Sequence, residues 1–456
     1  MVKLINSVEV VNFKSIGERG IKVDFAPATI LVGENNSGKS TLLEALVLLQ
    51  QSVGKDKIQY NGLINFGDFS QVVHKGEIDR QIGIKVTISV SENAKERILY
   101  LSKSLEKLLG LEVSANDLQR HGISYRIIFT ESKVDQVLEI GGYSILHVSS
   151  NQIIKPFKIK EELESVVDSI KILHISWKED VKDSALSDLI EIMKIAMNEV
   201  LKSIFSIYYI SAMRGLYDFI NEPRRLQIYH SEEFKDFEKL YVGSHGENAL
   251  YILYYLWKHR KSEELEKISE KLKKFDLGDL RSGPDMERGG FTSDYIDSYT
   301  GTIVNLRFAG TGSKQILPII VQLFCVKNSL IMIEEPEISF HAKFQRDFIK
   351  DMVKDAVLNN NNKVVFTTHS NIPILSIPLA IDDKFTANSV KVYHFERDLQ
   401  TFETICEELA INKFGYLEKP IPSYVKVEKE LFSKWLEVKE EEEEEFEDGG
   451  DVSDRH

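Results

Sequence analysis

The stretch that decides the fold reads Gly33-Glu34-Asn35-Asn36-Ser37-Gly38-Lys39-Ser40-Thr41. It fits the pattern G-x-x-x-x-G-K-[ST] of a phosphate-binding P-loop. Residues 28–32 (ATILV) have the composition of a short buried strand, and residues 41–49 (TLLEALVLL) that of an apolar helix. A strand, a glycine-bearing turn and a helix in this order predict a cradle of backbone N–H groups at a helix N-terminus, which binds phosphate.

The residue types in this stretch suit separate tasks. The glycines allow a tight turn, Lys39 supplies a charge for β- and γ-phosphates, and the Ser40 hydroxyl is placed for Mg²⁺. The predicted phosphate contacts are Gly33, Asn35, Asn36, Ser37, Gly38, Lys39, Ser40 and Thr41. The alternative is a chance match by a turn rich in Gly and Asn, and the flanking strand and helix argue against it.

The overall composition is typical of a globular protein. The 456 residues are 43% hydrophobic and 28% charged, which suits two or three structural units. No run approaches the ~18 apolar residues that a membrane span needs, and the N-terminus lacks a signal-peptide layout. We therefore expect a cytoplasmic protein with no membrane partner. The two cysteines, Cys325 and Cys406, lie in apolar surroundings and are expected to be reduced.

The negative charge is concentrated at the end of the chain. Residues 437–456 contain eleven acids and two bases, so they carry −9 of the net −14. Six consecutive glutamates, residues 440–445, repel one another, which predicts a disordered acidic tail. The other residues are only mildly acidic, so no overall field attracts DNA, although a local basic groove stays possible.

The pattern along the chain predicts an α/β protein in five segments. Strand-like residues 8–16 and 21–25 lead into the strand 28–32, which predicts one mixed sheet. No heptad pattern runs for many turns, so a long coiled-coil arm is not expected. The segments are an N-terminal lobe (1–90), an inserted and mostly helical subdomain with some strands (91–205), a return strand with helices (206–300), a C-terminal lobe (301–436) and the acidic tail (437–456). Within them, residues 123–130 and 134–140 are expected to pair as strands, residues 250–272 to form a helix, and residues 276–300 to form a loop with a hairpin.

A second group of chemically active residues follows two apolar strands in the C-terminal lobe. The run 329–333 ends in Glu334 and Glu335, and the run 363–368 ends in His369. Strands of a doubly wound sheet present ligand-binding residues at their C-terminal edge. Glu334 is the candidate for holding a metal ion, Glu335 the candidate base, and His369 a candidate contact to a γ-phosphate or attacking water. Solvated acids and a capping histidine are the alternative interpretation.

A further glycine-bearing helix start lies between these groups. Residues 308–315 read Phe-Ala-Gly-Thr-Gly-Ser-Lys-Gln and precede an apolar helix. This is a second site suited to an anion, although one nucleotide needs only one such cradle. The economical interpretation is that Gly310, Gly312, Ser313 and Gln315 contact the nucleotide of a second subunit.

Taken together, these motifs resemble the ABC-type ATPases, and within them the RecF/OLD-like (AAA_15/AAA_21-like) group of standalone ATPases. The resemblance rests on NFKS (Asn12–Ser15), GENNSGKST (Gly33–Thr41), YISAMRG (Tyr209–Gly215), GTGSKQILPII (Gly310–Ile320), IEEPEISFH (Ile333–His341) and TTHS (Thr367–Ser370). It implies an ABC-ATPase-like P-loop fold, ATP and Mg²⁺ as cofactors, and a dimer that sandwiches its nucleotides. Gly310–Gln315 would be the signature motif acting on the partner's γ-phosphate.

The resemblance leaves several functions open. Condensin and Rad50-like proteins need long arms, and OLD nucleases carry a Toprim domain with a D-x-D motif that these 456 residues lack. The sequence therefore looks most like ATPase subunits of bacterial anti-phage systems, in which a separate nuclease or toxin is the effector and a phage protein the trigger. A RecF-like repair ATPase that binds duplex DNA and the nucleotide-binding subunit of a transporter are the alternatives.

Deleting residues 440–456 should leave the melting temperature and the ATP turnover unchanged. The physical reason is that adjacent like charges repel and bury no surface. Thermal melting and phosphate release of the truncated and full chains test this. A large loss in either measurement would show that the acidic tail has a structural role.

Overall fold

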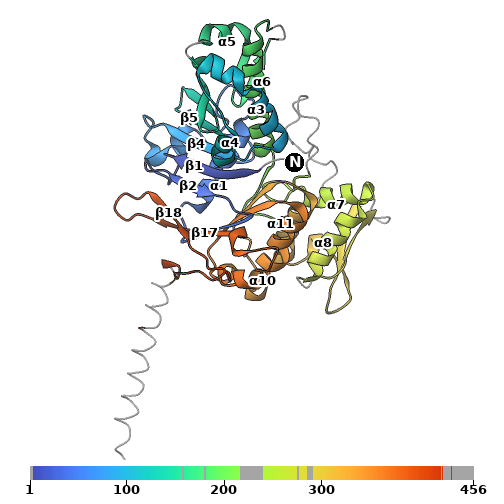
Figure 1. The fold of residues 1–456 in the computed structure, drawn as a ribbon. Helices are drawn as coiled ribbons and strands as arrows, with labels where there is room; N and C mark the ends of the chain where they lie inside the picture. Colours follow the sequence, from blue (N-terminus) through green and yellow to red (C-terminus); the bar gives the residue numbers. More distant parts are fainter. Residues whose placement is uncertain are drawn as a thin grey trace, which may run out of the picture.

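The computed structural model describes residues 4–422, except 157–158, 179–180, 216–239, 275–276 and 285–290, together with Tyr424 and Ser433. Two β-sheets form the body of the molecule, and helix α1 (Lys39–Ser52) contacts strands of both (Figure 1). Twelve of the fourteen residues of α1 are buried. A helix buried on nearly all sides explains why its sequence is apolar rather than amphipathic. The acidic tail, residues 437–456, lies outside the described residues.

A six-stranded sheet carries the P-loop strand. Its order is β11 (Ile207–Ile210), β15 (Leu330–Ile333), β16 (Lys363–Thr368), β3 (Ala28–Gly33), β17 (Val390–Arg397) and β18 (Thr404–Leu409). The first five strands are parallel and β18 is antiparallel, so the sheet is mixed, as predicted. Both faces are covered: Leu31 of β3 packs into the core shared with α1, and Ile30 and Val32 pack into a second core. Burial on both faces requires the continuous apolar runs seen in the sequence.

A seven-stranded antiparallel sheet forms the N-terminal lobe. Its order is β2 (Ile21–Asp24), β1 (Ile5–Val11), β4 (Ile82–Ile88), β5 (Ile123–Phe129), β6 (Val134–Ile140), β7 (Tyr143–Ser149) and β8 (Gln152–Lys155). The prediction that the first two strands share a sheet with the P-loop strand is wrong. Strand β1 instead pairs with β4, which follows the P-loop helix in the sequence. Pairing between strands so far apart in the sequence leaves no local signal.

The insertion combines helices with strands. The predicted pair of strands is confirmed as β5 and β6. Together with β7 and β8 they extend the N-terminal sheet past residue 90, so the insertion is less helical than expected. Its helices are α3 (Glu92–Leu109), α4 (Ala115–His121), α5 (Lys160–Val166) and α6 (Ser184–Ile204), and β9 (Val167–Lys171) pairs with β10 (His174–Trp177). Helix α3 packs along α6, at the top of Figure 1.

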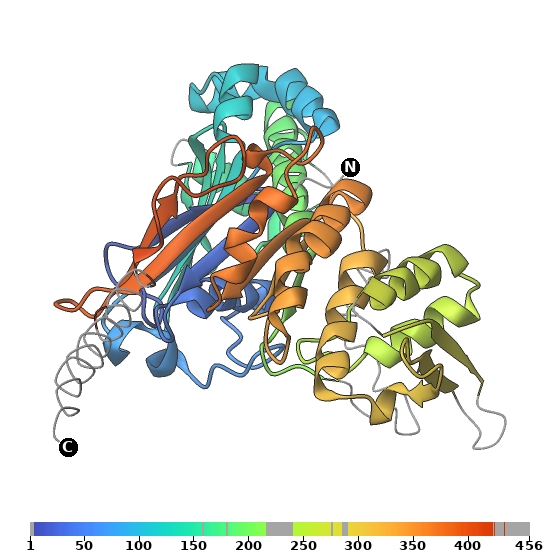
Figure 2. The same cartoon turned by 90° about the horizontal axis from the view of Figure 1, so that it is seen from below.

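Helices α9 (Thr311–Cys325), α10 (Ala342–Phe348) and α11 (Lys354–Asn360), with a π-helical turn at Ile349–Val353, cover the face of the six-stranded sheet that points away from α1 (Figure 2). Helices α7 (Ala249–Lys258) and α8 (Ser262–Lys274) pack against α9, on its side away from the sheet. The helix predicted over 250–272 is broken after His259, where Arg260 takes a left-handed φ of 53°. The predicted hairpin is β12 (Leu280–Pro284) with β13 (Phe291–Ile296), to which β14 (Ile303–Asn305) adds.

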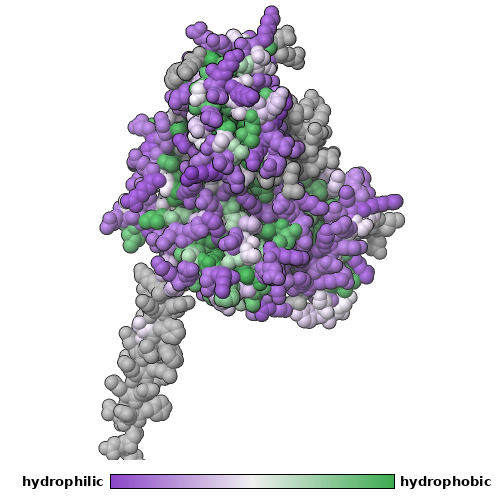
Figure 3. Space-filling view, in the orientation of Figure 1, coloured by the Kyte–Doolittle hydropathy of each residue, from purple (hydrophilic) through white to green (hydrophobic). Residues whose placement is uncertain are grey.

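The face shown in Figure 3 is largely hydrophilic, with apolar residues scattered among polar ones. Within the described residues, none of the helices combines the length and apolarity that crossing a membrane requires.

One lysine joins the two sheets. Lys363 opens β16, and its Nζ donates to the carbonyl oxygen of Ile5 at 2.9 Å, to Asn6 Oδ1 at 2.9 Å and to the carbonyl oxygen of Phe25 at 3.3 Å. These acceptors lie at the start of β1 and after β2. The ammonium at the start of β16 thus donates hydrogen bonds to oxygen atoms of the N-terminal lobe and ties that lobe to the six-stranded sheet.

Replacing Lys363 with Met should lower the free energy of unfolding by about 1–3 kcal/mol, because the oxygens that Lys363 serves lose their donor. The control is Lys22→Met, since the Lys22 side chain is 57% exposed and its ion pairs, at 3.9 Å, are long. Urea unfolding of both variants gives the comparison. Equal stability of the two variants would contradict a joining role for Lys363.

Candidate functional site

The P-loop lies between β3 and α1 and is pressed against distant parts of the chain. Gly33 has a φ of 153° and Gly38 a φ of 102°. A Cβ atom at Gly33 would lie 2.0 Å from the carbonyl oxygen of Phe395, and one at Gly38 would lie 2.2 Å from Thr404 Oγ1. Any side chain at these two positions would collide with β17 and β18, so the glycines are required by both backbone angle and space.

The start of α1 is open to an anion. Among the described residues no side chain caps the helix at Gly38, and its first turn contains no acid. The loop residues Asn35 and Asn36 are exposed, and Ser40 is half-buried. The N–H groups and the positive end of the helix dipole therefore face a space with no competing carboxylate in the first turn of α1. Ser37 and Thr41 are buried, and their backbone and side-chain oxygens contact Thr404 and Ser15.

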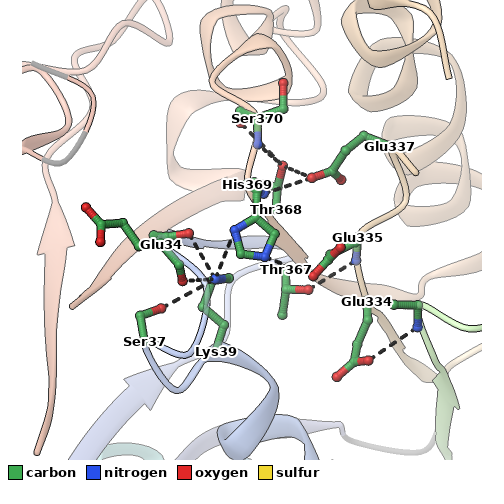
Figure 4. Close-up of polar contacts among 12 residues, drawn as sticks. Glu34, Ser37, Lys39, Glu334, Glu335, Glu337, Thr367, Thr368, His369 and Ser370 are labelled. Atoms are coloured by element: carbon green, nitrogen blue, oxygen red, sulfur yellow. Dashed lines mark hydrogen bonds and ion pairs between the residues drawn. The ribbon is translucent and has the colours of Figure 1, made fainter. Parts of the chain in front are cut away.

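Lys39 is buried at the centre of the loop, with 4% of its surface exposed. Its Nζ donates to the carbonyl oxygens of Gly33 at 2.9 Å and Glu34 at 2.7 Å, and lies 3.4 Å from Ser37 Oγ (Figure 4). Burial lowers the pKa of Lys39 to about 8, against the opposing effect of nearby carboxylates, that of Glu335 first. The ammonium is thus held in place, and a phosphate would supply a better counter-charge.

The order β15-β16-β3 brings the predicted catalytic residues to the P-loop. His369, after β16, contacts both neighbours: Nδ1 lies 3.5 Å from Lys39 Nζ and Nε2 lies 2.9 Å from Glu335 Oε1 (Figure 4). These partners fit a neutral imidazole that accepts at Nδ1 and donates from Nε2. The sequence-predicted residues Lys39, Glu335 and His369 therefore form one chain of polar contacts.

The two adjacent glutamates point to different surroundings. Glu335 has a left-handed φ of 42°, and its backbone N–H donates to the carbonyl oxygen and the hydroxyl of Thr367, each at 3.1 Å. The hydrogen bond from His369 holds the pKa of Glu335 below its ordinary value, although burial acts the other way. Glu334 is 7% exposed, and its Oε2 accepts from the backbone N–H of Ala212 at 3.3 Å.

A third glutamate, which the sequence analysis did not select, supports the histidine. Glu337 Oε1 accepts from Thr368 Oγ1 at 2.7 Å and from the backbone N–H of His369 at 2.8 Å (Figure 4). The hydroxyl of Tyr424 donates to the carbonyl oxygen of His369. His369 is therefore fixed by its backbone on both sides as well as by its ring. The only local signal was the acid at the second position after Glu335.

The second glycine-bearing loop lies apart from the P-loop of its own chain. Gly310 precedes α9, and Gly312 and Ser313 line a cavity of about 200 Å³ with Leu277, Ile316, Phe340 and Phe344. Within the described residues no hydrogen bond joins Gly310–Gln315 to Gly33–Thr41. The structure does not bring these two predicted anion sites together in one subunit.

The motif YISAMRG (Tyr209–Gly215) contains a buried arginine to which the sequence analysis assigned no role. Arg214 follows β11 and donates to backbone carbonyl oxygens of Gln315, Glu334 and Glu335. The sequence gives no sign of these three contacts, because the main-chain atoms that accept them lie more than a hundred positions away.

The residues fit a nucleotide with its magnesium ion better than a metal ion alone. Within the described part of the chain, no group of three or more His, Cys, Asp and Glu residues could hold a metal ion. Ser40 and Glu334 offer a hydroxyl and a carboxylate, which are oxygen ligands of the kind Mg²⁺ takes when substrate phosphates complete its shell. The open start of α1 and the buried ammonium of Lys39 fit the phosphates.

Comparison with protein families matches residues 4–374 to the AAA ATPase domain family, AAA_15. The chain belongs to this family. Membership makes it a nucleotide-binding ATPase, and it confirms the predicted fold class, a P-loop α/β fold with a mixed sheet.

The relatives are distant. Endonuclease GajA of Bacillus cereus (strain HuB5-5) is 24% identical over 405 residues, which cover 80% of this chain and 55% of GajA. The chain thus spans about half the length of this curated relative. Among solved structures, a SmcHead bound to the C-winged helix domain of ScpA has 12% identity and a TM-score of 0.47, covering 90% of this chain and 98% of that one.

An Smc head domain with an extended coiled coil, bound to the C-terminal domain of ScpA derived from Pyrococcus furiosus, has 13% identity and a TM-score of 0.47. It covers 94% of this chain and 99% of that chain. Both structural similarities are too weak to carry an argument about function.

ATP binding should take up protons above pH 8 and weaken as the pH rises. Free Lys39, with a pKa of about 8, is partly neutral there, and bound phosphates favour its charged form. Calorimetry at pH 8.5 in two buffers of different ionisation enthalpy measures the uptake, and titrations from pH 7 to 9 measure the affinity. An affinity that is constant over this range, with no uptake, would contradict the lowered pKa.

Proposed function

We propose that this chain hydrolyses ATP at a site shared between two subunits, and that the ATPase cycle controls a separate effector in anti-phage defence. The observation that carries the ATPase part is the contact of one imidazole, His369, with the P-loop lysine on one side and Glu335 on the other. The residues that bind phosphate and the residues that act on water are thereby linked in one place.

Each residue has a role that follows from its position. Lys39 and the N–H groups at the start of α1 bind the phosphates, and Ser40 and Glu334 would hold Mg²⁺, which neutralises charge on the phosphates. Glu335 accepts the proton of the attacking water, since its lowered pKa leaves it ionised at neutral pH. His369 orients Glu335 and contacts the γ-phosphate side of the site.

Glu335→Gln should bind ATP and hydrolyse it about 10²–10⁴-fold more slowly, because the amide keeps the size of the side chain and loses the base. Glu334→Gln is the matched variant and should weaken the dependence on Mg²⁺ instead. Single-turnover hydrolysis and nucleotide binding over a range of Mg²⁺ concentrations separate the two. If Glu334→Gln gave the ATP-trapped state and Glu335→Gln did not, the two roles would be reversed.

The proposed site is completed by a second copy of the chain. Gly310–Gln315 does not contact its own P-loop, and Gly310 and Thr311 are exposed at the start of α9. Among the described residues no side chain caps this helix start, so its N–H groups suit the γ-phosphate bound by a partner. The proposal is a homodimer, or a larger oligomer, with two composite nucleotide sites per pair.

Gly312→Asp should bind ATP but not hydrolyse it, because its carboxylate would face the partner's γ-phosphate. The substitution fits the fold, since the nearest neighbours of a Cβ there, Ser339 and Phe340, lie at ordinary contact distances of 3.4 and 3.5 Å. Gly312→Asn is the uncharged control of equal size and should retain more activity. Mixing Gly312→Asp with Lys39→Ala subunits should restore part of the hydrolysis that neither has alone.

Two results would contradict the shared site. One is hydrolysis by Gly312→Asp at the wild-type rate. The other is a mixture that forms mixed dimers, as measured by size, and yet does not hydrolyse ATP. A mixture of wild-type and Lys39→Ala subunits is the control for this result, because it shows whether a dimer with one intact site can hydrolyse ATP at all.

The proposed role in defence rests on the relative and on the chain's own motifs. GajA, of whose length this chain matches 55%, is named an endonuclease. We infer that a separate nuclease or toxin acts as effector. The finer hypothesis is that the chain corresponds to AriA, the ATPase of the PARIS system, with an AriB-like nuclease as partner and a phage-encoded trigger.

Neighbouring genes and co-purification test this role. A nuclease or toxin gene beside this one, whose product co-purifies with the wild-type chain, is the expected result. A permease or a set of repair genes in its place would favour a transporter subunit or a RecF-like factor, and salt-sensitive binding of duplex DNA would support the latter.

A further inference from the structure

Arg214 occupies an unusual position for an arginine. It lies just after β11, at the edge of the six-stranded sheet, and only 5% of its surface is exposed. Burial lowers the pKa of Arg214 to about 10, so the guanidinium is still charged at neutral pH. A buried charge is costly unless its donors are satisfied, which makes the identity of its partners informative.

The partners of Arg214 are all main-chain oxygens. Nη1 donates to the carbonyl of Glu334 at 2.7 Å and to that of Ser211 at 3.1 Å. Nη2 donates to the carbonyl of Glu335 at 2.9 Å, and Nε donates to the carbonyl of Gln315 at 3.1 Å. One planar, rigid side chain thus bonds simultaneously to the turn that carries both catalytic glutamates and to the first turns of α9.

Each of the two segments that Arg214 joins has an irregular backbone feature at this place. Pro318 lies inside α9 and removes the N–H that would bond to the carbonyl of Lys314, so the start of this helix is less firmly held. On the other side, the backbone of Glu335 adopts a left-handed conformation held by Thr367. A shift of α9 would therefore reach the Glu334–Glu335 turn through the guanidinium.

We propose that Arg214 is a positioning residue that couples the two nucleotide sites of a dimer. This rests on the proposed function, in which Gly310–Gln315 of one subunit binds the nucleotide of its partner. Closure of α9 on the partner's γ-phosphate then fixes Glu334 and Glu335 of the same subunit, which act on its own nucleotide. Occupancy of one site thereby sets the geometry of catalysis at the other.

The main test is Arg214→Lys, which keeps the charge but replaces the three-nitrogen fork with a single ammonium. ATP affinity should stay within about threefold, and turnover should fall about 10²-fold through misplacement of Glu335. The coupling also predicts that turnover of the wild-type chain depends sigmoidally on ATP and that turnover of Arg214→Lys depends on it hyperbolically. Arg97→Lys is the control, since that arginine is about half exposed and pairs with Glu191 in the insertion. Wild-type turnover and cooperativity in Arg214→Lys would overturn the proposal.

Mixed dimers decide whether Arg214 acts on its own glutamates. In a mixture of Arg214→Lys with Glu335→Gln, the first subunit has an intact Glu335 and receives an intact signature loop from its partner. The proposal predicts that this mixture stays inactive, because the link within the first subunit is broken. Recovery of hydrolysis would mean that Arg214 only positions Gly310–Gln315 for the partner's nucleotide and does not act on Glu335 of its own subunit. That result would overturn the coupling.

Folding and the dimer are controlled separately. If Arg214→Lys melts well below the wild type, Arg214→Gln, which removes the buried charge, replaces it under the same criteria. If the mixture of Gly312→Asp with Lys39→Ala fails, the shared site itself is wrong. If that mixture works and Arg214→Lys is cooperative and active, the shared site stands and only the coupling is lost.

Discussion

The contact between a buried ammonium and a neutral imidazole organises this molecule. Lys39 is surrounded by carbonyl oxygens of its own loop, and the ring of His369 lies between it and the carboxylate of Glu335. This arrangement is possible only because β3, β16 and β15 are neighbouring parallel strands that end at the same edge. The strand order of one sheet therefore determines the chemistry of the site, and the remaining layers hold that sheet in place.

The two cores serve this edge in different ways. The core around α1 fixes the P-loop helix between both sheets, and Lys363 satisfies oxygens of the N-terminal lobe from the opposite end of β16. The second core packs α9 and its neighbours against the other face of the six-stranded sheet. The P-loop thus lies next to the buried helix α1, on one face of the six-stranded sheet. On the other face, the start of α9 with its exposed Gly310 is accessible.

The sequence predicted those parts of the structure whose information is local. The P-loop, the buried strands ending in Glu334–Glu335 and His369, and the hairpin near residue 290 each have a pattern within a few residues. The pairing of β1 with β4, and the continuation of that sheet by β5–β8, depend on contacts between distant segments and were not predicted. The sequence analysis assigned no role to Glu337 or Arg214 for the same reason: Glu337 accepts from Thr368 and His369 on another strand end, and Arg214 donates to main-chain oxygens of distant segments.

The crowding of Gly33 against Phe395 and of Gly38 against Thr404 has a consequence for how the chain matures. Residues 33–41 leave the ribosome early, but the surface that shapes them is made by Phe395 in β17 and Thr404 in β18, which are synthesised much later. A growing chain that has not yet reached Thr404 contains the complete P-loop motif but lacks the residues of β17 and β18 that pack against it. Ordering of the loop is then completed by folding rather than by the ligand, and bound nucleotide stabilises only chains in which both ends have come together.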